Sequence, residues 1–299
     1  MENIHLLTTE SVNPNTKNID SLDTIDVLKE INREDKKVAE AVEKQLPQIA
    51  KAVDAMKVRF WDGGRIIYVG AGSSGRMGTL DAVELTPTYS VDPSRAFGII
   101  AGGKEAMYHA IEGAEDSKEL AIQDLKNVNL TEKDIVIGIA ASGRTPYTIS
   151  ALEYGNRVGA LTIAVTCNGE SEMAKVASIS IAPVVGPEVI SGSTRMKAGT
   201  AQKMVVNMLS TATMVACGKV YQNYMVNVQP TNEKLVIRAT NMIAEIIGID
   251  YAEASKLLNE SGMSVAAAIL MHKKHIPKEK AHEVLETCHG KVSKALALL

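Results

Sequence analysis

A short apolar run that leads into glycines and serines has the residue types and spacing to bind an anion. The stretch reads RIIYVGAGSSGRMGT. Gly70 and Gly72 allow a tight turn and a close approach of the backbone to a ligand. Ser73 and Ser74 each offer a hydroxyl, and a helix that begins just after them directs its unpaired N–H groups to the same point. The stretch therefore predicts a phosphate-binding loop.

The spacing of this loop argues against a nucleotide ligand. A P-loop would end in Gly-Lys-Ser/Thr, and a dinucleotide fingerprint would have an acidic residue about 20 positions later at a strand end. Neither feature is present. Taken alone, the loop also fits a glycine-rich turn with a serine helix cap and no ligand.

Two further loops repeat the pattern of an apolar run, hydroxyl side chains and a helix start. The second follows residues 135–141, and the third lies within residues 186–203. Their candidate phosphate-binding residues are Ser142, Gly143 and Thr145 in the second loop and Ser191, Ser193 and Thr194 in the third. Ligands of open α/β sheets bind beyond the carboxyl ends of the strands, so loops of this type can converge. Together, the three loops favour a phosphate-binding site over glycine-rich turns without a ligand.

Alternating strands and helices must position these loops. Strands are predicted at residues 66–70, 96–101, 135–140, 160–166 and 179–183. This alternation indicates an α/β fold with a doubly wound, mostly parallel sheet of the flavodoxin-like type. Helical segments are predicted at residues 24–61 with an interruption at Pro47, at 202–218, and, after a linker at 228–232, at 233–248, 251–261, 265–274 and 278–288. The first forms an N-terminal helical arm and the last four a small C-terminal helical unit.

Composition limits the class of protein and of ligand. The 299 residues are 45% hydrophobic, which suffices for a full core in one large domain and a small one. The formal net charge of −3 and the absence of a Lys/Arg stripe argue against nucleic-acid binding. No apolar run of about 18 residues predicts a membrane span and no signal-peptide pattern is present, so a cytoplasmic protein is expected. The three cysteines and the dispersed histidines predict neither a disulfide framework nor a metal site.

The loops also carry a family resemblance. GAGSSGR, ASGRTP and the alternation between them resemble the sugar isomerase (SIS) fold, a phosphosugar-binding module. The strings LLTTESVNPNT, REDKKVAEAVEKQLPQIA, GAGSSGRMGTLDAVELTPTY, IEGAEDS and GPEVISGSTRMKAGTAQKMVVNMLST resemble the N-acetylmuramic acid 6-phosphate etherases over most of the chain, and more weakly in the last 60 residues. Together with the predicted elements, this divides the chain into an arm at residues 1–56, a phosphosugar-binding domain at 57–227 and a helical domain at 233–299.

The resemblance implies a reaction and its participants. Enzymes of that family cleave the lactyl ether of N-acetylmuramic acid 6-phosphate to N-acetylglucosamine 6-phosphate and D-lactate in the recycling of cell-wall sugar. They use neither a metal nor a nucleotide, so no cofactor is expected. The expected partner is a small phosphosugar.

This reaction requires two proton-transfer groups. The ether at C3 of the open-chain sugar lies β to the aldehyde, so removal of the C2 proton and protonation of the leaving oxygen expel lactate, and water then adds to the alkene. Glu84 and Glu115 match the positions of the catalytic acid and the catalytic base in the family. We expect Glu84 to protonate the lactyl oxygen and Glu115 to remove the C2 proton. Without the resemblance, Glu84 reads as a helix-end glutamate paired with a lysine and Glu115 as part of a solvated acidic run.

Four other charged residues each have two interpretations. Asp81 either shares the helix face of Glu84 and affects its pKa, or is a plain surface acid. Glu188 either binds sugar hydroxyls or supports its own loop, and loop support is slightly favoured. Arg76 and Arg144 either pair with the phosphate or the lactyl carboxylate, or form salt bridges within the fold.

Helix geometry predicts a twofold assembly. A helix that begins near Gly75 places Glu84 about 14 Å further along its axis. That is too far from the phosphate end to reach C3 of the same sugar, unless a kink before Pro87 shortens the distance. We therefore expect a homodimer in which each subunit supplies Glu84 to the phosphate loops of its partner.

Two other functions fit the same fold. A non-catalytic phosphosugar sensor resembling glucokinase regulatory protein would have a second SIS module, for which this chain has no room. An aldose-ketose isomerase would also use a glutamate base at C2. Isomerases of this type usually need a histidine for ring opening or proton transfer, and none accompanies these loops.

Overall fold

The computed structural model describes residues 8–228, 230 and 232–299. The described chain divides into two compact units. One comprises the described residues up to Val83 with Ser94–Ser210, and the other comprises Glu84–Pro93 with the described part of Thr211–Leu299. The predictions for residues 1–7, and part of the predicted linker at 228–232, lie outside the described residues. The three-part domain division stays a prediction.

Parallel strands form the sheet of the first unit. They are β1 (Ile66–Gly70), β2 (Ala96–Ile100), β3 (Ile135–Ile139), β4 (Leu161–Val165) and β5 (Ile179–Ile181). Their order is β2-β1-β3-β4-β5, and each neighbouring pair is parallel. This confirms the predicted α/β fold, and each strand end lies within two residues of its prediction. The order changes direction between β1 and β3, and ligands of such sheets bind at this switch point.

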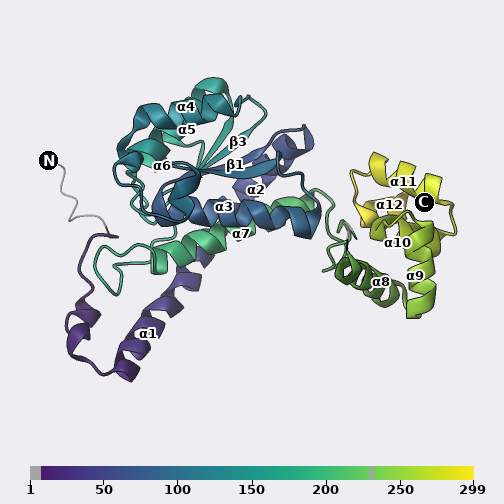
Figure 1. Ribbon diagram of the computed structural model, residues 1–299, viewed down its shortest axis with the longest axis horizontal. Helices are drawn as coiled ribbons and strands as arrows, with labels where there is room; N and C mark the ends of the chain where they lie inside the picture. The colour runs from purple at the N-terminus through teal and green to yellow at the C-terminus, as the bar shows by residue number, and fades with distance from the viewer. Residues whose placement is uncertain (1–7, 229, 231) are drawn as a thin grey trace. The chain divides into compact units, whose positions relative to one another are not determined.

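Helices cover both faces of the sheet (Figure 1). One face carries α4 (Lys118–Asn127), α5 (Pro146–Val158) and α6 (Glu172–Val176), and the other carries α2 (Leu46–Trp61), α3 (Gly72–Tyr89) and α7 (Lys197–Ala216). Side chains alternate along β1, so Ile67 and Val69 pack in the core with α5, while Tyr68 faces α3. A Cβ on Gly78 would lie 2.6 Å from the Cβ of Tyr68, so only glycine permits this close packing of α3.

The N-terminal arm contains two helices, and the break between them lies just before the interruption predicted at Pro47. Helix α1 (Thr24–Glu43) ends before Pro47, which lies in the first turn of α2. Proline suits that position because the N–H it lacks would have no partner there. The side chain of Asp23 accepts a hydrogen bond from the N–H of Asp26 at 2.9 Å and caps the start of α1.

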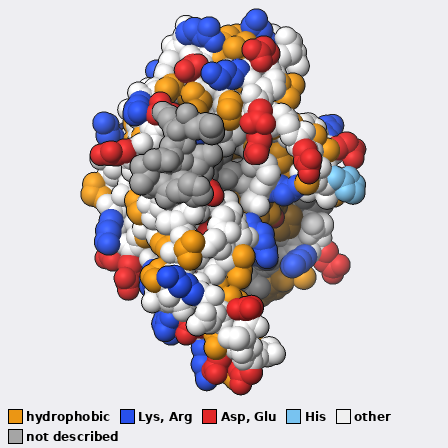
Figure 2. All heavy atoms as spheres, turned by 90° about the vertical axis from the view of Figure 1, so that its left-hand side faces the viewer, with side chains coloured by type: hydrophobic (Ala, Val, Ile, Leu, Met, Phe, Trp, Pro, Cys, Tyr) orange, Lys and Arg blue, Asp and Glu red, His pale blue; other side chains and the backbone are white. Residues whose placement is uncertain are grey.

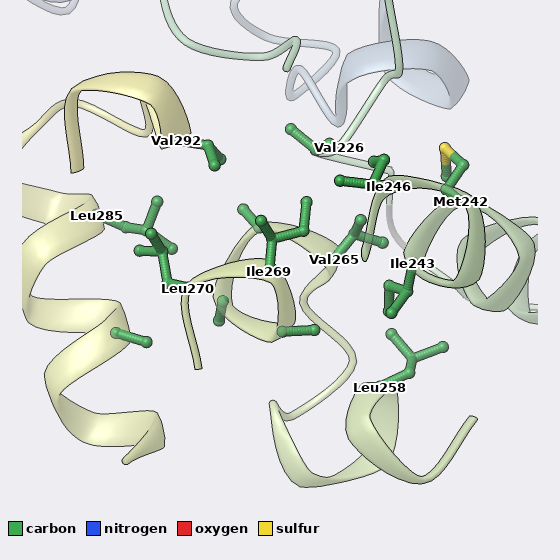
Figure 3. Close-up of a cluster of buried hydrophobic side chains, with 14 of the residues drawn as sticks. Val226, Met242, Ile243, Ile246, Leu258, Val265, Ile269, Leu270, Leu285 and Val292 are labelled. Atoms are coloured by element: carbon green, nitrogen blue, oxygen red, sulfur yellow. The ribbon is translucent and has the colours of Figure 1, made fainter. Parts of the chain in front are cut away.

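The second unit contains a helical bundle with its own hydrophobic core. Its helices are α8 (Glu233–Ile247), α9 (Tyr251–Glu260), α10 (Val265–Lys274), α11 (Lys278–Thr287) and α12 (Val292–Leu298). Figure 3 shows Ile243, Leu258 and Ile269 among the buried side chains of this core. The first four helices confirm the predicted segments, whereas α12 was missed because its short apolar sequence has no clear periodicity. Within the described residues, no helix is long and apolar enough to cross a membrane.

Candidate functional site

The first two candidate loops begin side by side. Gly70 at the end of β1 is paired with Ile139 at the end of β3. Ser73 and Ser74 lie in the first turn of α3, which begins at Gly72 and not near residue 75 as predicted. Gly72 has a φ of 50°, a left-handed conformation that favours glycine. The two hydroxyls and the first N–H groups of α3 therefore lie at the switch point of the sheet.

The second loop turns beside them at a glycine in the left-handed conformation. Gly143 has a φ of 67°, and a Cβ there would lie 2.3 Å from the Cβ of Ser171. The hydroxyl of Ser142 accepts the N–H of Arg144 at 3.3 Å. Thr145 occupies the N-cap position of α5, but its side chain makes no capping hydrogen bond. The N–H groups in the first turn of α5 therefore donate no hydrogen bond to this side chain.

The third loop contacts the N-terminal segment. The hydroxyl of Thr16 donates to the carbonyl of Val189 at 2.8 Å. Throughout residues 8–228, no hydrogen bond joins Ser191, Ser193 or Thr194 to the first two loops. The structure thus brings the first two loops together and does not join the hydroxyls of the third loop to them.

Helix α7, which follows the third loop, contacts α3 through polar side chains, of which Gln202 and Asp81 are buried. The hydroxyl of Ser74 donates to Oε1 of Gln202 at 2.9 Å. Asp81 accepts hydrogen bonds from Tyr68 and Asn207, both at 2.6 Å. Burial raises the pKa of Asp81, although these hydrogen bonds oppose the rise. The interpretation of Asp81 as a surface acid was wrong, because Asp81 is buried and joins α3 to β1 and α7.

Two other charged residues support loops. The guanidinium of Arg76 donates to backbone carbonyls of residues 106–109 at 2.7 to 3.1 Å, so it holds the segment after β2. Neither interpretation of Arg76 predicted this contact. The carboxylate of Glu188 accepts the N–H groups of Lys197 at 3.0 Å and Ala198 at 2.9 Å. This confirms loop support for Glu188, since it caps the start of α7.

A buried ion pair joins the N-terminal arm to α7. Nζ of Lys197 lies 2.7 Å from Oε2 of Glu34, and each side chain is 1% exposed. Nζ of Lys37 lies 2.6 Å from the other carboxylate oxygen. Burial acts to raise the pKa of Glu34, but the hydrogen bonds and charges of Lys197 and Lys37 outweigh it and lower the pKa to about 2. The ammonium group of Lys197 is therefore engaged in a structural ion pair.

Replacement of Glu34 by Gln is expected to lower the free energy of unfolding at pH 7 by about 3 kcal/mol, because Lys197 loses its buried counter-charge. The folded-state pKa of about 2 lies below the ordinary 4.5. The stabilisation is therefore complete above pH 4.5 and is lost as the pH falls towards 2. Denaturant unfolding across this range should give a shallower acid decline for the variant than for the wild-type protein.

The control for this prediction is Glu283→Gln, which removes the carboxylate of an exposed pair with Lys280. Exposed pairs contribute little to stability, so this variant should unfold like the wild-type protein. A Glu34→Gln variant that is equally stable would contradict the assigned role of the buried pair.

The two candidate proton-transfer groups are both exposed. Glu84 lies on α3, and Leu80 and Val83 just before it are 51% and 62% exposed. Glu115 lies on the 3-10 turn η5 (Ala114–Asp116), which packs against α5, the helix that follows the second loop. The chain by itself therefore isolates neither carboxylate from water.

Two residues that support the site were not predicted from the sequence. Nδ2 of Asn168 donates to the carbonyls of Ala141 and Ser142 and to the hydroxyl of Thr9, at 3.1 to 3.2 Å, and so holds the second loop. In the sequence, the only indication of Asn168 was the polar cluster that follows the fourth strand. The other is Gln202, whose buried position on α7 gave no signal in the sequence.

Comparisons with known proteins agree with this fold. Residues 48–156 match the glucokinase regulatory protein N-terminal SIS domain, and residues 116–212 match the SIS domain. The chain is 61% identical over 295 residues to N-acetylmuramic acid 6-phosphate etherase 1 of Enterococcus faecalis, covering 99% of this chain and 98% of that protein. It is 59% identical over 298 residues to the N-acetylmuramic acid 6-phosphate etherase of Clostridium botulinum strain Okra, covering 99% of each. The corresponding protein of Lactobacillus johnsonii is 56% identical over 291 residues, covering 97% of this chain and 98% of that protein.

Proposed function

Because the chain belongs to the N-acetylmuramic acid 6-phosphate etherase family, we propose that it cleaves the lactyl ether of this sugar phosphate to N-acetylglucosamine 6-phosphate and D-lactate. The observation that carries the proposal is 56 to 61% identity to etherases over nearly the whole chain. The two hydroxyl-rich loops at the switch point support it, since they offer an anion site where ligands of such sheets bind.

In the proposed reaction, the first two loops hold the 6-phosphate. The hydroxyls of Ser73, Ser142 and Thr145 and the N–H groups at the start of α3 donate to its oxygens, and the hydroxyl of Ser74 turns from Oε1 of Gln202 to the phosphate. The backbone of Gly143 shapes the second loop around it. The hydroxyls of Ser191, Ser193 and Thr194 are proposed to bind the sugar, although the third loop contacts the N-terminal segment in the isolated chain.

The proposed chemistry is an elimination followed by an addition. Glu115 removes the C2 proton of the open-chain sugar, and Glu84 protonates the oxygen at C3 as its bond to carbon breaks, which releases D-lactate. Water then adds a hydroxyl at C3 and a proton at C2 of the alkene, giving N-acetylglucosamine 6-phosphate.

Incubation of the purified protein with N-acetylmuramic acid 6-phosphate tests the function. The expected result is equimolar D-lactate and N-acetylglucosamine 6-phosphate. Binding without lactate would instead support a phosphosugar sensor. Conversion of an aldose phosphate to a ketose phosphate would support an isomerase.

We further propose that the enzyme is a homodimer with shared active sites. Glu84 is twelve residues beyond the start of α3, so it lies about 18 Å along the axis from the first residue of the helix. The exposed apolar side chains of Leu80 and Val83 beside it offer a surface that a second copy would bury. Such burial would also remove Glu84 from water.

Mixing two inactive variants tests the shared site. One carries Ser74→Ala with Ser142→Ala, and the other carries Glu84→Gln. If subunits exchange at random, half of the dimers are hybrids with one intact site each, so about a quarter of the wild-type activity should return. No recovery, despite subunit exchange shown by mass spectrometry, would mean that Glu84 acts on the sugar of its own chain.

The proposal also covers nucleic-acid binding and the cellular location. We expect no nucleic-acid ligand, since the formal net charge is −3 and Figure 2 shows acidic and basic side chains interspersed on the face it presents. A cytoplasmic location is expected as well, because the substrate of the named relatives is a phosphorylated sugar.

A further inference from the structure

A buried amide beside the first loop has an unused donor. In the described residues, three buried side-chain polar atoms have no hydrogen-bond partner: Oγ1 of Thr148, Oγ of Ser180 and Nε2 of Gln202. Of these three side chains, Gln202 alone is hydrogen-bonded to a candidate phosphate-binding residue. Its Oε1 accepts the hydroxyl of Ser74 at 2.9 Å, and its side chain is 1% exposed.

This arrangement leaves a strong donor next to an anion site. Oε1 and Nε2 belong to one amide group, so the two N–H bonds of Gln202 lie close to the hydroxyl of Ser74. A buried donor without a partner is costly, and a ligand that supplies an acceptor removes that cost when it binds. A phosphate oxygen is a charged acceptor and makes a stronger hydrogen bond than a neutral group.

We propose that Gln202 is a phosphate-binding residue that donates a hydrogen bond from Nε2 to the 6-phosphate of the bound sugar. The inference rests on the proposed function, because it places the phosphate at the first loop. It adds a side chain from α7 to a site that otherwise consists of residues after β1 and β3. A phosphate would thereby be held from α3, α5 and α7 together.

Calorimetric binding of N-acetylglucosamine 6-phosphate, the reaction product, tests the proposal without turnover. Gln202→Met keeps the length of the side chain and removes both polar atoms. The affinity for the product should fall at least about tenfold, whereas the weak binding of unphosphorylated N-acetylglucosamine should not change. Gln123→Met, the same substitution at an exposed position on α4, should leave both affinities unchanged.

A double-mutant cycle separates direct binding from an effect through Ser74. If Gln202 only orients the hydroxyl of Ser74, then Gln202→Met will cost nothing further in a Ser74→Ala background. If Nε2 binds the phosphate, the double variant should bind the product several-fold more weakly than Ser74→Ala alone. Gln202→Glu, which replaces the donor by an acceptor, should weaken binding even more than Gln202→Met, and it serves as the second variant should Gln202→Met not fold.

The outcomes distinguish this inference from the proposed function. Wild-type turnover with unchanged product affinity in the Gln202 variants would overturn the inference and leave the etherase function intact. Equal losses for phosphorylated and unphosphorylated sugar, or no added loss in the Ser74→Ala background, would also overturn it. A wild-type protein that neither binds the product nor releases lactate would overturn both.

Discussion

Replacement of Glu84 or Glu115 by Gln should lower kcat for D-lactate release at least about 100-fold, with folding intact. Each substitution keeps the shape of the side chain and removes the group that transfers a proton in the proposed elimination. Both carboxylates are exposed in the chain, so the fold does not depend on them. Rapid-quench or coupled assays of D-lactate give kcat, and circular dichroism reports on folding.

Exchange of the C2 proton with deuterated solvent assigns the two roles. Loss of the base abolishes exchange, whereas loss of the acid leaves exchange intact but prevents lactate release. We expect the Glu115→Gln variant to lose exchange and the Glu84→Gln variant to keep it. The opposite pattern would reverse the roles.

The matched control is Glu112→Gln, an exposed glutamate in the same segment as Glu115. It should retain wild-type kcat, because no step of the proposed reaction uses it. Wild-type turnover by both the Glu84→Gln and Glu115→Gln variants would remove these carboxylates from the mechanism.

Removal of the phosphate from the substrate should reduce kcat/KM more than any single change in the loops. The phosphate forms charge-assisted hydrogen bonds with both loops, and each contributes on the order of 1 to 3 kcal/mol. Ser74→Ala or Ser142→Ala should therefore raise KM about 5- to 150-fold for the phosphorylated substrate. Steady-state kinetics with and without the 6-phosphate measure both effects.

The control for the loops is Ser180→Ala, which removes a hydroxyl on β5 that has no partner in the described structure. It should leave KM unchanged, since β5 is separated from the β1 and β3 loops by β4 in the sheet. Equal turnover of N-acetylmuramic acid with and without its phosphate would contradict the assignment of the loops.

The strands, their parallel pairing, most helices and the first two loops could be predicted from the sequence alone. The physical reason is that these features depend on neighbouring residues. Periodic apolar residues specify a buried strand, and Gly72 or Pro146 favours the local backbone that its position requires. The resemblance over most of the chain also indicated the family and the two candidate glutamates, which residue chemistry alone left ambiguous.

The contacts between distant polar groups became visible only in the folded chain. Ser74 and Gln202 are 128 positions apart, Asn168 and Thr9 are 159 apart, and Glu34 and Lys197 are 163 apart. No local pattern encodes such contacts, because each depends on how α7 and the N-terminal segment pack against the sheet. For the same reason Asp81 could not be recognised as buried: the partners that satisfy its carboxylate come from β1 and α7.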